Sequence, residues 1–370
     1  MEVAPHSEII AMQARTNGMA PAWKKTRLLS PADLPASSAE FRVLGVFNPA
    51  AVAWEGGAVL LVRVAELPLE TRPDHTPLPR YDEDGRQVVD WLANDDLELI
   101  DRRVVRCGTS RVARLTSASH LRVVIVGLDH KIKRFGPRIT PHGQQEEYGM
   151  EDPRITRIGD RYYITYVAVS RHGVATAVMS TSDFESFERH GIIFPTENKD
   201  VVLLPERVGN DYVALHRPVG GMAFTGPEMW IARSPDLVHW GQHRPLYRGL
   251  SAWETGRVGA GAPPVRTERG WLEIYHGNRR PTTPVEVGAY CAGGMVLDLE
   301  RPERIRKLAP IPLLEPTEPY ELTGFVPNVV FPGGIVEAEG RILVYYGAAD
   351  ESTAVAETTW ADLWHAFDSK

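Results

Sequence analysis

The feature that most constrains the fold of this chain is a hairpin pattern, strand, turn and strand, that recurs along it. In the first copy, apolar strands flank the turn Glu55-Gly56-Gly57. The copies lie at 41–64, 155–167, 203–216, 264–276 and 334–346. Hairpin repeats of roughly 50 to 70 residues are typical of β-propellers with four-stranded blades. The pattern therefore predicts an all-β fold, a five-bladed β-propeller.

Two segments do not follow the repeat. Residues 1–40 are mixed in character and are predicted to form an N-terminal arm, which leaves 41–370 as the propeller domain. Residues from about 67 to 118 separate the first two copies, and we expect them to be an insertion in the first blade. The arm and the insertion are where subunit contacts are expected if the chain forms a homo-oligomer.

Composition and charge exclude several classes of protein. The 32 glycines and 29 prolines among 370 residues favour short strands and tight turns. A net charge of -7, without a long Lys/Arg run, argues against a nucleic-acid or membrane partner. Two distant cysteines, Cys107 and Cys291, favour a reducing compartment over a disulfide framework or a zinc site. Since the N-terminus does not resemble a signal peptide, we expect a cytoplasmic protein without a metal site, nucleotide loop or redox cofactor.

Polar residues occur at corresponding places in the five repeats. The innermost strands of a propeller face a common axis, so such residues converge although they are distant in sequence. In chain order they are Asn48, Arg63, Asp152, Arg154, Asn198, Lys199, Asp200, His216, Arg217, His276 and Asp350. This pattern predicts one central polar site.

The segment Glu151-Asp152-Pro153-Arg154 supplies the candidate acid. Pro153 disfavours helical backbone at Asp152, so we expect Asp152 to be extended at the mouth of the following strand, with its carboxyl group held in one direction. The alternative is that both carboxylates cap a surface turn and pair with Arg154.

Lys199, Arg217 and His276 would bring cationic donors together in an otherwise acidic chain. Arg offers a planar fork and Lys a point charge, which suits a tetrahedral anion such as phosphate. The alternative for each histidine alone is a structural residue at the end of a strand.

Several separated motifs, in the same order, resemble glycoside hydrolase family 130, the β-mannoside phosphorylases. The resemblance extends from about Phe47 to Ala356. Its motifs are Gly-Met-Glu-Asp-Pro-Arg-Ile-Thr at 149–156, Asn-Lys-Asp-Val-Val-Leu-Leu-Pro-Glu at 198–206, Leu-His-Arg-Pro at 215–218, Tyr-His-Gly at 275–277 and Tyr-Tyr-Gly-Ala-Ala-Asp at 345–350.

This resemblance implies a five-bladed propeller that cleaves a β-mannoside with inorganic phosphate and inverts the anomeric centre. Asp152 would be the general acid, acting through a mannose hydroxyl. The resemblance implies no cofactor, and inorganic phosphate is a co-substrate. Because phosphate already carries negative charge, no second carboxylate is needed to activate it. The implied phosphate ligands are Lys199, Arg217 and His276, and the residues expected to contact the mannoside are Asn48, Arg63, Asp350, Arg154 and His216.

Two other functions stay open on the sequence. A hydrolase on the same fold would use a carboxylate to activate water, and Glu147, Glu151 and Glu206 are available. A non-catalytic propeller would bind sugar with Asp152 as a hydrogen-bond acceptor only. The linkage and the acceptor sugar cannot be assigned, since no motif matches residues 67–118.

Overall fold

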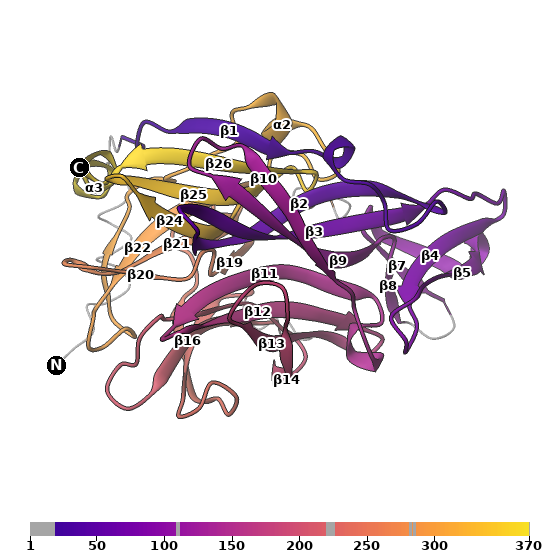
Figure 1. The fold of residues 1–370 in the computed structure, drawn as a ribbon, viewed down its shortest axis with the longest axis horizontal. Helices are drawn as coiled ribbons and strands as arrows, with labels where there is room; N and C mark the ends of the chain where they lie inside the picture. Colours follow the sequence, from indigo (N-terminus) through magenta and orange to yellow (C-terminus); the bar gives the residue numbers. More distant parts are fainter. Residues whose placement is uncertain (1–18, 109–111, 220–225, 281–282, 284–285, 370) are drawn as a thin grey trace.

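Strands make up most of the protein in a computed structural model that describes residues 19–369 apart from 109–111, 220–225, 281–282 and 284–285 (Figure 1). Helices are few and short. The all-β prediction is therefore confirmed.

The main strands form three sheets of twelve, four and five strands. Single parallel bridges, Ala51 to Gly334 and Ser119 to Gly149, divide the twelve-stranded sheet into three, which makes five antiparallel groups. The first contains β2 (Phe41–Trp54), β3 (Gly57–Pro68), β9 (Ala118–Gly127) and β10 (Ile132–Ile139). The second contains β11 (Gly149–Ile158), β12 (Arg161–Ser170), β13 (Gly173–Thr181) and β14 (Glu188–Phe194). The third contains β15 (Asn198–Leu203), β16 (Tyr212–Pro218), β17 (Met229–Ser234) and β18 (Gly241–Tyr247).

The last two groups complete the series. The fourth contains β19 (Arg257–Gly259), β20 (Val265–Thr267), β21 (Gly270–Asn278), β22 (Tyr290–Leu297) and β23 (Ile305–Leu308). The fifth contains β24 (Val330–Ala338), β25 (Arg341–Ala348), β26 (Ser352–Thr359) and β1 (Lys24–Leu29). Since β1 pairs with β26, part of the predicted N-terminal arm is a strand of the last group.

Four of the five predicted hairpins coincide with paired strands, and the third needs a correction. Its predicted first strand begins at Leu203, where the observed strand β15 (Asn198–Leu203) ends. Pro205 explains the difference, because proline has no N–H to donate to a strand ladder.

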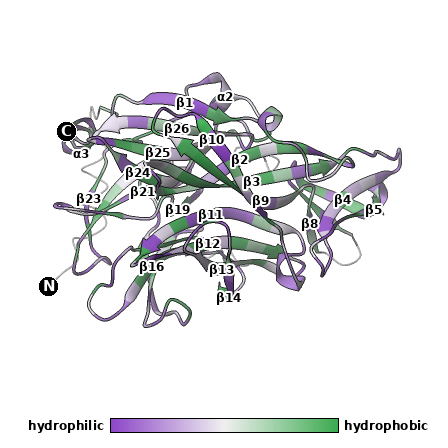
Figure 2. Ribbon diagram, in the orientation of Figure 1, coloured by the Kyte–Doolittle hydropathy of each residue, from purple (hydrophilic) through white to green (hydrophobic). Residues whose placement is uncertain are grey.

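Each group packs on the next through an apolar cluster, and the fifth packs on the first. In Figure 2, hydrophobic residues run along the strands of these groups. Residues that share a cluster across neighbouring groups include Leu61 with Ile155, Val178 with Ala214, Val213 with Trp271, Ile274 with Val344, and Tyr345 with Val62. Closure into a five-bladed propeller stays a prediction.

The predicted insertion forms two small sheets between β3 and β9. They contain β4 (His75–Tyr81), β5 (Gln87–Ala93), β6 (Leu97–Asp101), β7 (Val104–Cys107) and β8 (Ala113–Leu115). In Figure 1, β4 and β5 project at one end of the molecule, on the right.

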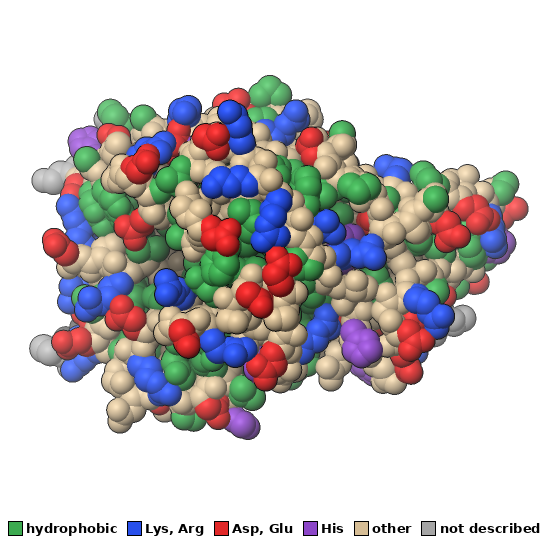
Figure 3. Space-filling model, viewed as in Figure 1, with side chains coloured by type: hydrophobic (Ala, Val, Ile, Leu, Met, Phe, Trp, Pro, Cys, Tyr) green, Lys and Arg blue, Asp and Glu red, His purple; other side chains and the backbone are tan. Residues whose placement is uncertain are grey.

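The helical segments among the described residues are peripheral. They are η1 (Pro31–Asp33), η2 (Asn94–Asp96), η3 (Gln144–Glu146), α2 (Pro319–Leu322) and α3 (Trp360–Asp368). In the described part of the chain, no helix has the length and apolar character needed to cross a bilayer. Acidic and basic side chains are intermixed on the face drawn in Figure 3.

Candidate active site

A bulge of the same kind occurs in the first strand of three groups, and each bulge carries a polar residue. Two residues of the bulged strand oppose one residue of its partner: Asn48 and Pro49 oppose Val62, Asp152 and Pro153 oppose Tyr166, and Asp200 and Val201 oppose His216. The φ angles of Asn48, Asp152 and Asp200 are 47°, 46° and 55°. Asn and Asp tolerate this left-handed backbone better than most residues do, and bulges redirect side chains.

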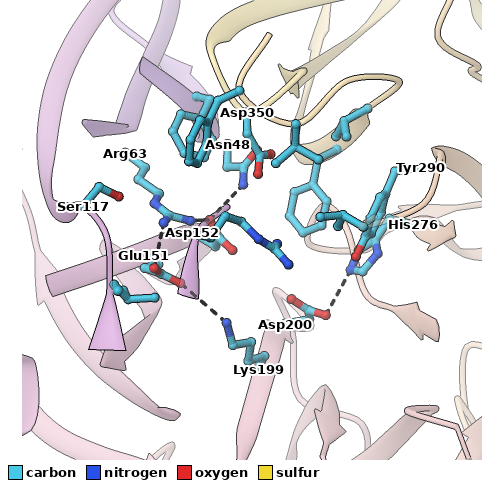
Figure 4. Close-up of a pocket in the computed structure, with 18 of the residues that line it drawn as sticks. Asn48, Arg63, Ser117, Glu151, Asp152, Lys199, Asp200, His276, Tyr290 and Asp350 are labelled. Atoms are coloured by element: carbon cyan, nitrogen blue, oxygen red, sulfur yellow. Dashed lines mark hydrogen bonds and ion pairs between the residues drawn. The ribbon is translucent and has the colours of Figure 1, made fainter. Parts of the chain in front are cut away.

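The three bulged residues line one cavity. Of the nine predicted site residues, seven lie on its wall: Asn48, Arg63, Asp152, Lys199, Arg217, His276 and Asp350. Figure 4 shows six of these labelled around the cavity, from different strand groups. The lining includes five Lys or Arg and four Asp or Glu side chains, so this site is locally less acidic than the chain as a whole.

Asp152 differs from the sequence expectation in its backbone and in its partner. It lies inside β11 in the left-handed region, not before a strand in extended conformation, because the bulge determines its backbone. Its Oδ1 accepts hydrogen bonds from Asn48 Nδ2 at 2.9 Å and from Arg63 Nη1 at 3.0 Å. The ion pair therefore forms with Arg63, and the predicted surface alternative with Arg154 is wrong.

The two carboxyl groups of Asp152 and Asp350 have opposite pKa shifts. Burial disfavours ionisation of Asp152, but the charges of Arg63, Lys199 and Arg154 outweigh it and lower its pKa. Burial raises the pKa of Asp350 to about 6, against the opposing effect of Arg103 and Arg63. In the free protein at neutral pH, Asp152 is thus a carboxylate.

The three predicted phosphate ligands each contact a carboxylate. Asp200 Oδ2 lies 3.0 Å from Arg217 Nε and 3.0 Å from His276 Nε2. Lys199 Nζ lies 3.5 Å from Glu151 Oε2, which is a long contact. Although Asp200 is buried, its interactions with Arg217, His276 and Arg154 hold its pKa far below its ordinary value.

Three nitrogen atoms at this site are buried without a hydrogen bond in the described part of the chain: Arg217 Nε, Arg217 Nη1 and His276 Nδ1. Arg217 Nε is in ion-pair contact with Asp200, whereas Arg217 Nη1 and His276 Nδ1 have no partner within that part. Buried polar atoms are normally paired, so each indicates a missing partner. Burial lowers the pKa of His276 more than Asp200 raises it. The neutral ring donates through Nε2 to Asp200, which leaves Nδ1 as an acceptor.

Arg154 and His216 do not line the cavity. Arg154 donates to the carbonyl oxygens of Gly261, Asp152 and Pro153, so it supports the bulge from behind. His216 lies between Asn198 and His243 and stacks on Phe194. Burial and His243 lower its pKa to about 3, which indicates a neutral structural residue.

Sequence reasoning did not assign roles to Asp200 and Arg103, and considered Glu151 only as the base of a hydrolase; all three line the cavity. A signal for Asp200 was present, because Lys199-Asp200 occupies the bulge position of Glu151-Asp152. Glu151 Oε1 accepts from Arg63 Nη2 at 2.7 Å. No sequence signal marks Arg103, which comes from the turn between β6 and β7.

The three carboxylates proposed for a hydrolase occupy different environments. Glu147 pairs with Arg171 at 2.6 Å, and Glu206 is exposed beside Arg266. Only Glu151 of these three lies on the cavity wall, and it already binds Arg63 and Lys199.

Comparisons with known proteins identify the family of this chain. The family model for glycoside hydrolase family 130, described as beta-1,4-mannooligosaccharide phosphorylase, matches residues 91–368. A beta-1,2-mannobiose phosphorylase of Listeria innocua is 35% identical over 93% of this chain and 97% of its own length. A beta-1,4-mannooligosaccharide phosphorylase of Ruminococcus albus is 34% identical over 60% of this chain and 66% of its own length.

A solved structure extends the comparison to the fold. The Listeria innocua beta-1,2-mannobiose phosphorylase in complex with beta-1,2-mannobiose has a TM-score of 0.86 at 33% identity. The match covers 94% of this chain and 99% of that chain. The chain therefore belongs to glycoside hydrolase family 130, the family of the β-mannoside phosphorylases.

Proposed function

We propose that the protein cleaves a β-1,2-linked mannoside with inorganic phosphate, giving α-mannose 1-phosphate and the shortened sugar. The long match to a relative named beta-1,2-mannobiose phosphorylase supports this linkage. We also propose that the five strand groups are the blades of a propeller. The successive packing of the groups, with the fifth on the first, supports that arrangement.

The observation that carries the proposal is the pair of buried, unpaired nitrogens on Arg217 and His276. A phosphate ion would accept a hydrogen bond from Arg217 Nη1, and His276 Nδ1 would accept from a P–OH group or bind a proton. Lys199 is held by a long contact of 3.5 Å to Glu151, so it is free to turn towards the phosphate.

Asp152 is the proposed general acid. Its pKa is low in the free protein partly because of Lys199, and a phosphate dianion beside Lys199 would offset that charge and favour protonation. The proton passes to a mannosyl hydroxyl, whose own proton passes to the glycosidic oxygen. The C1–O bond breaks, a phosphate oxygen bonds to C1 from the opposite face, and the configuration inverts.

Direct hydrolysis needs a carboxylate that is free to activate water. Glu151 lines the cavity, but its Oε1 accepts a hydrogen bond from Arg63 at 2.7 Å, so this carboxylate is held in an ion pair. Phosphate carries its own charge and needs no such base. The arrangement of charges therefore favours phosphorolysis over hydrolysis.

The test is the variant Arg217→Ala. Loss of one charge-assisted contact costs roughly 1.5 to 3 kcal/mol, so the KM for phosphate should rise about 10- to 100-fold. The KM for the mannoside should change much less. The control is Arg244→Ala, which removes an exposed arginine from β18 of the same strand group. Unchanged phosphate kinetics in Arg217→Ala would refute this phosphate site.

A further inference from the structure

The insertion between β3 and β9 forms part of the cavity wall. Four of its residues line the cavity: Arg103, Val104, Leu115 and Ser117. Arg103 lies in the turn between β6 and β7, Val104 begins β7, Leu115 ends β8, and Ser117 lies between β8 and β9. The segment that matches no motif thus reaches the site.

Arg103 is held in one orientation by contacts within the insertion. Its Nε and Nη2 donate to the two carboxylate oxygens of Asp101 at 3.2 and 2.8 Å. Its carbonyl oxygen accepts from the backbone N–H of Thr116 at 2.9 Å. Among the described residues, Nη1 has no hydrogen-bond partner, so its two N–H groups are free to donate to a ligand.

The turn that carries Arg103 is also attached to another segment of the cavity wall. Arg102 Nη1 donates to the carbonyl oxygen of Phe325 at 2.5 Å, and Phe325 lines the cavity before β24. Arg102 and Phe325 are 223 residues apart in sequence. This contact fixes the small sheet across the site.

Arg103 occupies the more open part of the cavity. Its side chain is 32% exposed, whereas the side chains of Asp152 and Arg217 are 11% and 6% exposed. Asp350 and Tyr290 are close enough to raise its pKa, together with Asp101, against the opposing effect of burial. Arg103 therefore lies on the Asp350 and Tyr290 side, towards solvent.

We propose that Arg103 binds the leaving-group sugar, the one that departs when the glycosidic bond breaks, and so helps to select the acceptor in the reverse reaction. This inference rests on the proposed phosphorolysis. In this reaction the mannosyl unit lies between Asp152 and the buried phosphate ligands Arg217 and His276, so the second sugar extends towards the mouth.

The chemistry of this wall suits a neutral sugar ring. Nη1 of Arg103 offers two N–H donors to neighbouring hydroxyls, and a guanidinium fixed by Asp101 loses little freedom on binding. Val104 and Leu115 provide an apolar surface for the C–H face of the ring. Ser117, labelled in Figure 4 beside Arg63, adds a hydroxyl group to the cavity wall.

The test is synthesis from α-mannose 1-phosphate and mannose by the full chain and its Arg103→Gln variant. We expect the KM for mannose to rise about 10- to 100-fold, as for the loss of a hydrogen bond from a charged donor. The KM for α-mannose 1-phosphate should change less than twofold. Asp101→Asn, which loosens the orientation of Arg103, should produce a smaller rise of the same kind.

The control is Arg106→Gln, which removes an arginine of the same small sheet that pairs with Glu98 and does not line the cavity. Thermal midpoints of all variants verify folding. If Arg103→Gln raises the KM for α-mannose 1-phosphate and not that for mannose, or changes neither, the assignment is refuted. If the unmodified protein makes no disaccharide, the proposed function itself fails, which is a separate result.

Discussion

Asp200 provides a test of how the phosphate ligands are held before phosphate binds. Its buried carboxylate lies 3.0 Å from Arg217 and from His276, with side-chain exposures of 2%, 6% and 1% for the three residues. The variant Asp200→Asn keeps the shape of the side chain and removes its charge. Arg217 is then a buried cation with one fewer counter-ion.

The expected effect on stability follows from that burial. Removing one partner of a buried ion pair typically costs about 3 to 5 kcal/mol, because the other charge stays out of water. We expect a loss of this size in phosphate-free buffer. Phosphate should then stabilise the variant more than the unmodified protein. In the variant the bound phosphate supplies the negative charge that Arg217 has lost, and the Asp200 carboxylate is no longer present to repel the phosphate. A ligand at 100 times its Kd adds about 2.7 kcal/mol.

The assay is urea unfolding of both proteins with and without phosphate, with sodium chloride added to match ionic strength. Asp160→Asn, an exposed aspartate in the turn between β11 and β12, is the matched control. The reasoning is refuted if phosphate stabilises Asp200→Asn no more than it stabilises the unmodified protein.

Two further predictions concern carboxyl groups. Asp152→Asn should lower kcat roughly 100-fold or more, the scale expected for loss of a general acid, with little change in thermal midpoint. An unchanged kcat would refute the role of Asp152 as general acid. Burial raises the pKa of Glu273 from 4.5 to about 8. The stability that protonated Glu273 contributes at low pH is therefore lost as the pH rises from 4.5 to about 8. Glu273→Gln should remove a few kcal/mol of this pH dependence, measured by urea unfolding at about pH 5 and about pH 8; an unchanged slope would contradict it.

The hairpins were readable from the sequence because turn residues and apolar runs are local signals. The backbone conformation of Asp152 could not be predicted from the sequence, because a bulge depends on the pairing with the partner strand, here at Tyr166. The rule for residues before proline predicted extended backbone, and the pairing of β11 with β12 overrode it.

The site was predictable only where the repeat itself carried the information. Equivalent strand positions identified Asn48 and Asp152, and a comparison of the bulge positions could have added Asp200. His216 precedes Arg217 in β16. It packs against Phe194 and does not line the cavity, because neighbouring residues of a strand point to opposite faces. Arg103 reaches the cavity through the fold of the insertion, which no local pattern describes.

The most direct test of the central claim is to incubate the purified protein with β-1,2-mannobiose, with and without inorganic phosphate, and to follow the products by NMR. The account predicts cleavage only with phosphate, with one α-mannose 1-phosphate formed for each bond broken. Release of free mannose at the same rate with and without phosphate would contradict it.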